Sequence, residues 1–152
     1  MEGLKRAGKI RAWGVSNLDL GDMDELASAG GANCATDQVL YNVTRRGPEF
    51  DLLRALAERN VPVIAYSPVE QGRLPRGGAL QAIADRHGVT AYQVALAWAV
   101  RSANIVAIPK AADVAHVRQN RDASDLVLTA RDVAEIDAAF PPPTRATRLE
   151  ML

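Results

Sequence analysis

The sequence is poor in several features, and each shortage excludes a class of protein. Only one of its 152 residues is cysteine, so no disulfide can form within the chain. We expect this residue, Cys34, to be a small buried side chain in a reducing compartment, which favours a cytoplasmic protein. Lys plus Arg equal Asp plus Glu at 18 each, and no basic cluster points to nucleic acid. No apolar run is long enough for a membrane span, and no signal peptide opens the chain.

Several catalytic motifs are also missing from the sequence. It has no Gly-x-Gly-x-x-Gly after a strand, no Walker loop and no His-Glu-x-x-His, so there is no sign of a metal site. A hydrolytic triad of Ser67, His87 and Asp85 has no support from their spacing. Hydrophobic residues make up 48% and charged residues 24%, which is typical of a single globular domain.

The most informative feature that the sequence does contain is a set of four short apolar runs, each of which ends in polar residues. We expect strands at 10–15, 35–40, 61–66 and 104–108. The intervals between them are long enough for crossover helices, so the strands should be parallel, in an α/β fold. A repeating strand–helix order with polar strand ends is typical of a (β/α)8 barrel, of which only four units are present. Parallel strands end at one rim, where we expect these side chains: Ser16, Asn17, Gln38, Tyr66, Ser67 and Lys110.

Amphipathic helices are expected between and after the strands. The predicted spans are 20–29, 48–59, 78–86, 90–101, 112–121 and a last helix from Thr129 to Pro141. Thr90 with Gln93, and Thr129 with Asp132, predict capping boxes. Pro48 should open its helix, with Phe50 on the apolar face.

The two ends of the chain have a character of their own. Residues 1–9 are predicted to be the end of a helix that has no N-cap, so we expect a segment before Met1 to be missing. Residues 141–152 are expected to form a loosely held tail after a run of three prolines.

The expected rim suits a ligand with a carboxamide ring and phosphates. Two side-chain amides and a hydroxyl, in Asn17, Gln38 and Ser16, can hydrogen-bond a carboxamide. Tyr66 can stack on a heteroaromatic ring, and Lys110 and the N-terminus of the helix after it can bind phosphate. Each residue alone is more often a cap, a packing residue or a surface charge. Together, in this order, they favour a nicotinamide dinucleotide.

Six motifs carry a resemblance to a known family: Gly8–Asn17, Asp37–Asn42, Val61–Pro68, Gln93–Trp98, Ala107–Lys110 and His116–Asn120. From about Leu4 to Pro141 the chain resembles the aldo-keto reductases, which are NAD(P)H-dependent carbonyl reductases. The resemblance implies that residues 1–152 are the C-terminal half of a (β/α)8 barrel, holding family strands five to eight.

The resemblance also implies roles for single residues. Ser16, Asn17 and Gln38 would hold the nicotinamide carboxamide, and Tyr66 would stack on its ring. Lys110 would meet the 2′-phosphate of NADP. The pyrophosphate and adenine positions would be Ser67, Val69 and Gln71, and Gln119 and Asn120, respectively.

Three residues depart from the family pattern near the proposed phosphates. Ala111 replaces a serine, and His116 replaces an arginine near the 2′-phosphate, so NAD is a second candidate cofactor. Glu70 replaces a neutral residue, and we expect its side chain to point to water.

The family's catalytic Asp, Tyr, Lys and His match no position here. Tyr41 lacks a lysine partner, and His87 resembles a histidine at a helix C-terminus. We therefore expect the isolated chain to be inactive as a reductase.

Three interpretations stay open. The chain can be the cofactor half of a carbonyl reductase, reducing a small carbonyl substrate only when an N-terminal half is supplied. It can be a non-catalytic dinucleotide-binding half-barrel that forms a homodimer through its open sheet edges. It can also be a truncated, inactive product.

Overall fold

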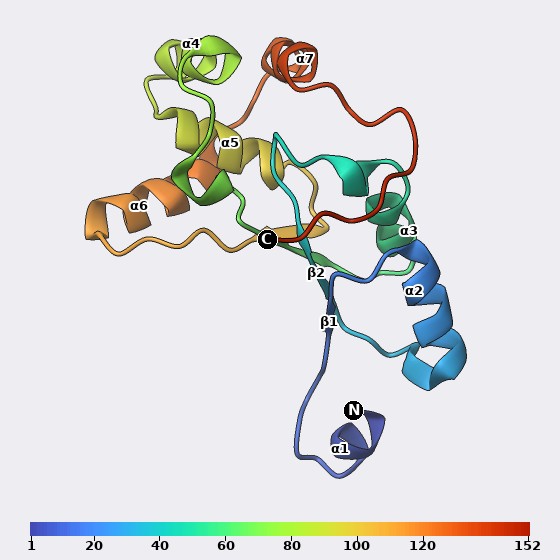
Figure 1. Cartoon of the computed structure of the whole chain (residues 1–152). Helices are drawn as coiled ribbons and strands as arrows, with labels where there is room; N and C mark the ends of the chain where they lie inside the picture. The colour runs from blue at the N-terminus through green and yellow to red at the C-terminus, as the bar shows by residue number, and fades with distance from the viewer.

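The computed structural model describes residues 1–152, which form a four-stranded parallel sheet with helices along it (Figure 1). The strands follow chain order in the sheet, and they are β1 (Val15–Ser16), β2 (Asp37–Leu40), β3 (Val63–Tyr66) and β4 (Ile105–Ala107). All three pairings are parallel. The predicted α/β fold with four parallel strands is therefore confirmed.

The strands are shorter than predicted, most of all β1. Its N-terminal neighbour Gly14 lies so close to β2 that an added Cβ would stand 2.5 Å from the Thr36 methyl carbon and 2.7 Å from the Thr36 carbonyl oxygen. Only glycine permits this approach. Backbone bonding continues across it, because Ala35 N donates to Trp13 O at 2.8 Å and Val15 N donates to Thr36 O at 2.9 Å.

The register of the sheet sorts the side chains onto two faces. On one face Asp37, Val63 and Ile105 lie side by side and are buried. On the other face Gln38 pairs with Ile64, which pairs with Val106, and Val106 is 53% exposed. The core therefore lies on the first face, and the second face carries the polar strand ends.

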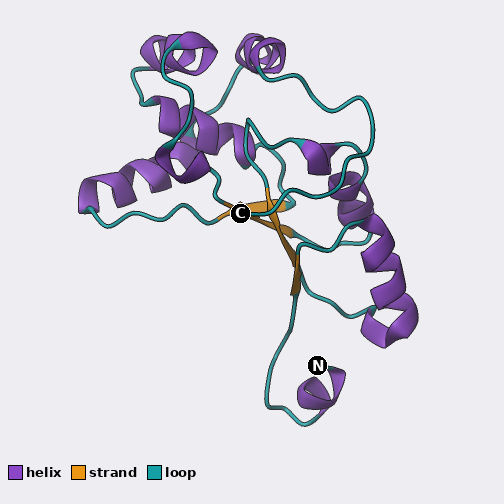
Figure 2. Ribbon diagram, viewed as in Figure 1, coloured by secondary structure: helices purple, strands orange, loops and turns teal.

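Each predicted helical region contains a helix. Figure 2 shows the helices in purple around the strands in orange. The α-helices are α1 (Glu2–Arg6), α2 (Leu20–Leu26), α3 (Leu52–Glu58), α4 (Gly78–His87), α5 (Ala91–Ala99), α6 (Val114–Asp122) and α7 (Ala130–Ala139). A π-helical turn, Ala27–Gly31, extends α2, and short 3-10 turns lie at Gly47–Glu49, Glu70–Gly72 and Ala123–Asp125. Both predicted capping boxes, at Thr90 and Thr129, are present.

Two details of the third helix were predicted wrongly. Pro48 opens a separate 3-10 turn, and α3 begins only at Leu52. Phe50 lies in the break between them and is 46% exposed, instead of packing into the core. The break rotates Phe50 out of the helical face that Leu52 and Leu56 bury.

The core is built around Trp98 of α5, which is fully buried. Tyr41 stacks on its ring at 5.4 Å between centroids, and the guanidinium carbons of Arg46 and Arg101 lie 4.9 and 3.9 Å from the ring centroid. Glu49 pairs with both arginines. The cluster ties the segment after β2 to the end of α5.

A second cluster joins α4 to α7. The buried carboxylate of Asp132 accepts hydrogen bonds from Thr129 and from Arg86, and His87 Nε2 lies 2.8 Å from Asp132 Oδ2. Burial by itself raises the pKa of Asp132, but these hydrogen bonds, led by that of Arg86, hold it well below its usual range. His87 thus lies at the end of α4, as the sequence predicted, and its partner there is Asp132.

The N-terminal end of the chain lies apart from this core, whereas Leu149 of the C-terminal tail packs against it. In Figure 1, α1 stands away from the other helices, and Trp13 Nε1 donates a 2.8 Å hydrogen bond to Glu2 Oε1.

None of the helices has the length and the apolar character that a membrane span requires.

Candidate functional site

The end of β1 and Gln38, the second residue of β2, form the first part of the site. The register sets Ser16 beside Gln38, and the hydroxyl of Ser16 and the backbone N–H of Asn17 both donate to the Gln38 carbonyl oxygen, each at 2.9 Å. Asn17 has φ +58°, a left-handed conformation that asparagine tolerates better than most residues. Its Oδ1 is buried and accepts no hydrogen bond from the protein.

Tyr66 ends β3 on the same face of the sheet. It lies two residues beyond Ile64, so both side chains point to the face that Gln38 shares. Tyr66 is half-buried, with part of its surface open. Backbone direction changes at the next residue, because Ser67 has φ +49°.

A cavity of about 880 Å³ forms the second part of the site. The loop after β3, the start of α5 and the segment from β4 into α6 line it. This volume lies within the range of small-molecule and cofactor pockets. Seven of the residues singled out from the sequence line it: Ser67, Val69, Gln71, Lys110, His116, Gln119 and Asn120.

The other four candidates, Ser16, Asn17, Gln38 and Tyr66, do not line this cavity. Ser16, Asn17 and Tyr66 lie at the carboxyl ends of β1 and β3, whereas Gln38 is the second residue of β2 and lies beside Ser16, so its predicted place at the end of its strand was wrong. The sequence-predicted residues therefore fall into two groups, one at the strand ends and one in the cavity, with Tyr66 and Ser67 adjacent in the chain between them.

The cavity wall includes residues that sequence reasoning missed, at the start of α5. Thr90, Tyr92 and Gln93 line it, and the Tyr92 hydroxyl donates a 2.9 Å hydrogen bond to the Gly72 carbonyl oxygen. The capping box located this helix start in the sequence. It carried no signal that the first turn would face the loop after β3.

Glu70 corrects one expectation. The residue is only 7% exposed, so its carboxylate does not point to water. The carboxylate accepts hydrogen bonds from Asn42 Nδ2 at 2.8 Å and from Arg45 Nη2 at 3.0 Å. Burial alone raises the pKa of Glu70, but the hydrogen bonds from Arg45 and Asn42 give it a lowered pKa. The carboxylate is thus turned away from the cavity, which it does not line.

The N-terminus of α6 corrects another expectation. We predicted that it would be open to an anion, with the helix starting near 112. The helix starts at Val114, and the side chain of Asp113 caps it by accepting from Ala115 N at 2.7 Å and His116 N at 3.3 Å. A carboxylate already satisfies these donors, so Lys110 is the main cationic group at this end of the cavity.

Tyr41 is not available as a proton donor to a ligand. It is fully buried, its hydroxyl donates to Glu49 Oε1 at 2.6 Å, and it accepts from Arg101 at 2.9 Å. Burial raises the pKa of Tyr41 above its ordinary value. The sequence-based rejection of this tyrosine agrees with its position in the core.

A parallel sheet with polar strand ends and a large cavity at its carboxyl rim is typical of α/β proteins that bind a cofactor or substrate there. Comparison with known proteins narrows this class. Residues 1–140 match the sequence profile of the Aldo/keto reductase family. The chain belongs to this family.

Two relatives illustrate the match. The chain is 46% identical over 158 residues to methylglyoxal reductase YeaE of Escherichia coli (strain K12), covering 100% of this chain and 56% of that protein. It is 31% identical over 138 residues to glyoxal reductase of Bacillus subtilis (strain 168), covering 91% of this chain and 49% of that one. The chain thus spans about half the length of these relatives.

The fold agrees with a solved relative. An aldo/keto reductase of Klebsiella pneumoniae, crystallised with NADP and acetate, superposes with a TM-score of 0.95 at 46% identity. The match covers 100% of this chain and 56% of that one. A second structure, of an aldo-keto reductase from the same organism with NADPH, matches equally well.

Proposed function

We propose that this chain is the nicotinamide-dinucleotide-binding half of a carbonyl reductase of the aldo-keto reductase family, with NADPH as cofactor. The observation that carries the proposal is the cavity of about 880 Å³, which brings together seven residues selected from the sequence for this role. The K. pneumoniae relatives, crystallised with NADP and NADPH, support the choice of cofactor.

The side chains at the strand ends fit the nicotinamide. The buried Oδ1 of Asn17 has no donor in the protein, and the amide N–H of a carboxamide would satisfy it. The side chains of Ser16 and Gln38 complete this group. Tyr66 would cover one face of the ring and leave the opposite face to a carbonyl compound.

The cavity residues fit the remaining parts of the dinucleotide. Ser67, Val69 and Gln71 would contact the pyrophosphate, and Gln119 and Asn120 the adenine. Lys110 would pair with the 2′-phosphate, with His116 beside it. Because Asp113 caps the helix here and Ala111 has no hydroxyl, we propose that NADH is accepted as well.

The chemistry divides between cofactor and protein. Bound NADPH supplies the hydride for carbonyl reduction. The residues of this chain orient the nicotinamide and anchor the phosphates. We assign no proton donor within the 152 residues, so the chain alone should bind cofactor without turning over. The names of the two relatives suggest small α-oxoaldehydes as the substrate class of the complete reductase.

A second function, a binding half-barrel that dimerises without catalysis, has one observation in its favour. Val106 and Ile108, on or beside edge strand β4, are 53% and 46% exposed. Apolar side chains at an open edge favour association with another chain.

A fluorescence titration of the chain with NADPH and NADH tests the main proposal. Tyr66→Ala and Lys110→Ala should each weaken NADPH binding about tenfold or more, since stacking and a charge-assisted hydrogen bond are each worth ~1–3 kcal/mol. Lys5→Ala, an exposed residue of α1, is the matched control. Absence of saturable binding by the folded chain would contradict the proposal, as would equal binding by all variants.

A further inference from the structure

The loop after β3, Ser67–Gly72, has an unusual backbone. Ser67, Glu70 and Gln71 have φ of +49°, +49° and +55°, and Gly72 has φ +80°. Residues with a Cβ adopt this left-handed region only when surrounding contacts hold them there. Something outside the loop must therefore stabilise its shape.

Asn42, just after β2, provides one such contact, at the start of the loop and at Glu70 within it. Its Nδ2 donates to the Ser67 carbonyl oxygen at 2.9 Å and to Glu70 Oε2 at 2.8 Å. Its Oδ1 accepts from the backbone N–H and the hydroxyl of Thr44, both at 2.8 Å. These bonds fix the orientation of the amide, so Asn42 presents its donors to the loop.

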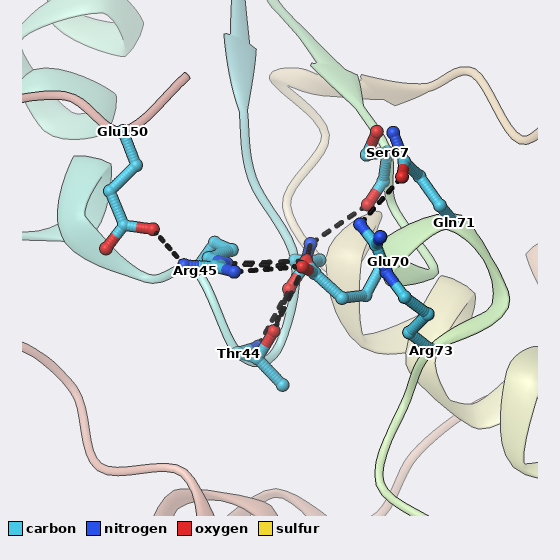
Figure 3. Close-up of polar contacts among 8 residues, drawn as sticks. Thr44, Arg45, Ser67, Glu70, Gln71, Arg73 and Glu150 are labelled. Atoms are coloured by element: carbon cyan, nitrogen blue, oxygen red, sulfur yellow. Dashed lines mark hydrogen bonds and ion pairs between the residues drawn. The ribbon is translucent and has the colours of Figure 1, made fainter. Parts of the chain in front are cut away.

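Arg45 provides the second contact, shown in Figure 3. Its Nη2 lies 3.0 Å from Glu70 Oε1, and its Nη1 lies 2.6 Å from Glu150 Oε2 in the C-terminal tail. The Glu70 side chain is 9% exposed, whereas that of Glu150 is 54% exposed. Removing the sheltered carboxylate of Glu70 should therefore disturb the loop more than removing the solvated carboxylate of Glu150.

The side chains of this loop divide between two directions. Ser67, Val69 and Gln71 line the cavity, while Glu70 turns back to Asn42 and Arg45. We propose that Glu70 is a positioning residue, whose bonds to Asn42 and Arg45 hold the loop in the shape that grips the pyrophosphate of the dinucleotide. This inference rests on the proposed function and adds a residue that does not touch the cofactor.

The experiment compares two ligands on the purified chain: NADPH, and adenosine 2′-monophosphate, which lacks the pyrophosphate. Glu70→Ala should weaken NADPH binding about tenfold, the loss expected when a buried hydrogen-bonded charge is removed. Binding of adenosine 2′-monophosphate should stay within about twofold, because the proposed contacts of Lys110, Gln119 and Asn120 are untouched. Glu70→Gln should fall between Glu70→Ala and the unchanged chain.

Glu150→Gln is the matched control, since it removes the exposed partner of the same arginine and should leave NADPH binding within about twofold. Trypsin cleavage after Arg73, which follows the loop and is exposed, gives an independent readout. Cleavage should be faster in Glu70→Ala and in Arg45→Ala than in the unchanged chain or the control.

The outcomes separate the two proposals. If the unchanged chain fails to bind NADPH, the proposed function fails, while trypsin still tests whether Glu70 holds the loop. If the chain binds NADPH and Glu70→Ala binds it equally well, the positioning role is overturned. Equal weakening of both ligands also overturns it, because the effect is then a general loss of structure. Arg45→Ala covers the case in which Glu70→Ala does not fold.

Discussion

Asp37 is the residue of this chain whose burial is hardest to infer from its neighbours in the sequence. It begins β2 and is fully buried, next to Gln38 of the candidate site. Burial raises the pKa of Asp37 to about 6, against an ordinary value of 3.8. Successive side chains of a strand point to opposite faces of the sheet, so Asp37 must face the core because Gln38 faces the site.

This raised pKa predicts a specific pH dependence of stability. Between pH ~4 and ~6 the folded chain holds the Asp37 proton more tightly than the unfolded chain, so the free energy of unfolding falls as pH rises. The loss is up to about 3 kcal/mol and is complete above pH ~6. Asp37→Asn should therefore be more stable than the unchanged chain at pH 7.5 and show a flatter profile in urea unfolding from pH 4 to 8.

Asp125→Asn is the control for this prediction. Its carboxylate is exposed and pairs with Arg121 within one turn of chain, so its removal should change stability little at any pH. A pH profile of Asp37→Asn that parallels that of the unchanged chain would show that Asp37 is not the titrating group.

At the scale of elements, features that depend on neighbouring residues were predicted correctly, and features that depend on distant residues were not. The boxes at Thr90 and Thr129 were correct because a capping box is made within four residues. The burial of Glu70, by contrast, depends on partners elsewhere in the sequence. Glu70 is buried by Asn42 and Arg45, which lie 28 and 25 residues away in the sequence.

Helix α6 offers a prediction about cofactor choice. The negative charge of its cap, Asp113, adjoins the end of the cavity where Lys110 is proposed to meet the 2′-phosphate. Asp113→Asn keeps the cap but removes the charge, so NADPH binding should tighten several-fold while NADH binding stays nearly constant. The measurement is the ratio of the two dissociation constants at low and high salt.

The control here is Asp24→Asn, since Asp24 is an exposed carboxylate of α2 paired with Arg59. It should leave the ratio unchanged. The gain in Asp113→Asn should also shrink at high salt, because it arises from screened charge repulsion. An equal change for NADPH and NADH would argue against repulsion of the 2′-phosphate.

At the scale of the whole molecule, the strand intervals predicted that the four strands are parallel, as they are. The sequence did not predict that the candidate residues fall into two groups, one inside the cavity and one outside it. Ser67 and Lys110 share a cavity, whereas Ser16 and Gln38 lie outside it, because the loop after β3 packs toward α5 through Tyr92 and Gly72. This contact joins residues 20 positions apart, and no periodic pattern in the sequence predicts it.

The sheet itself carries the last prediction. Its edges are β1 and β4, and Val106 of β4 is 53% exposed on the face opposite the core. Apolar edges favour pairing with a second sheet, so we expect the 152-residue chain to self-associate. Val106→Lys should shift sedimentation velocity profiles toward the monomer, because a charge at the contact must be desolvated. Val127→Lys, at an 81% exposed valine between α6 and α7, should not. A monomeric unchanged chain, or an equal shift in both variants, would count against association through this edge.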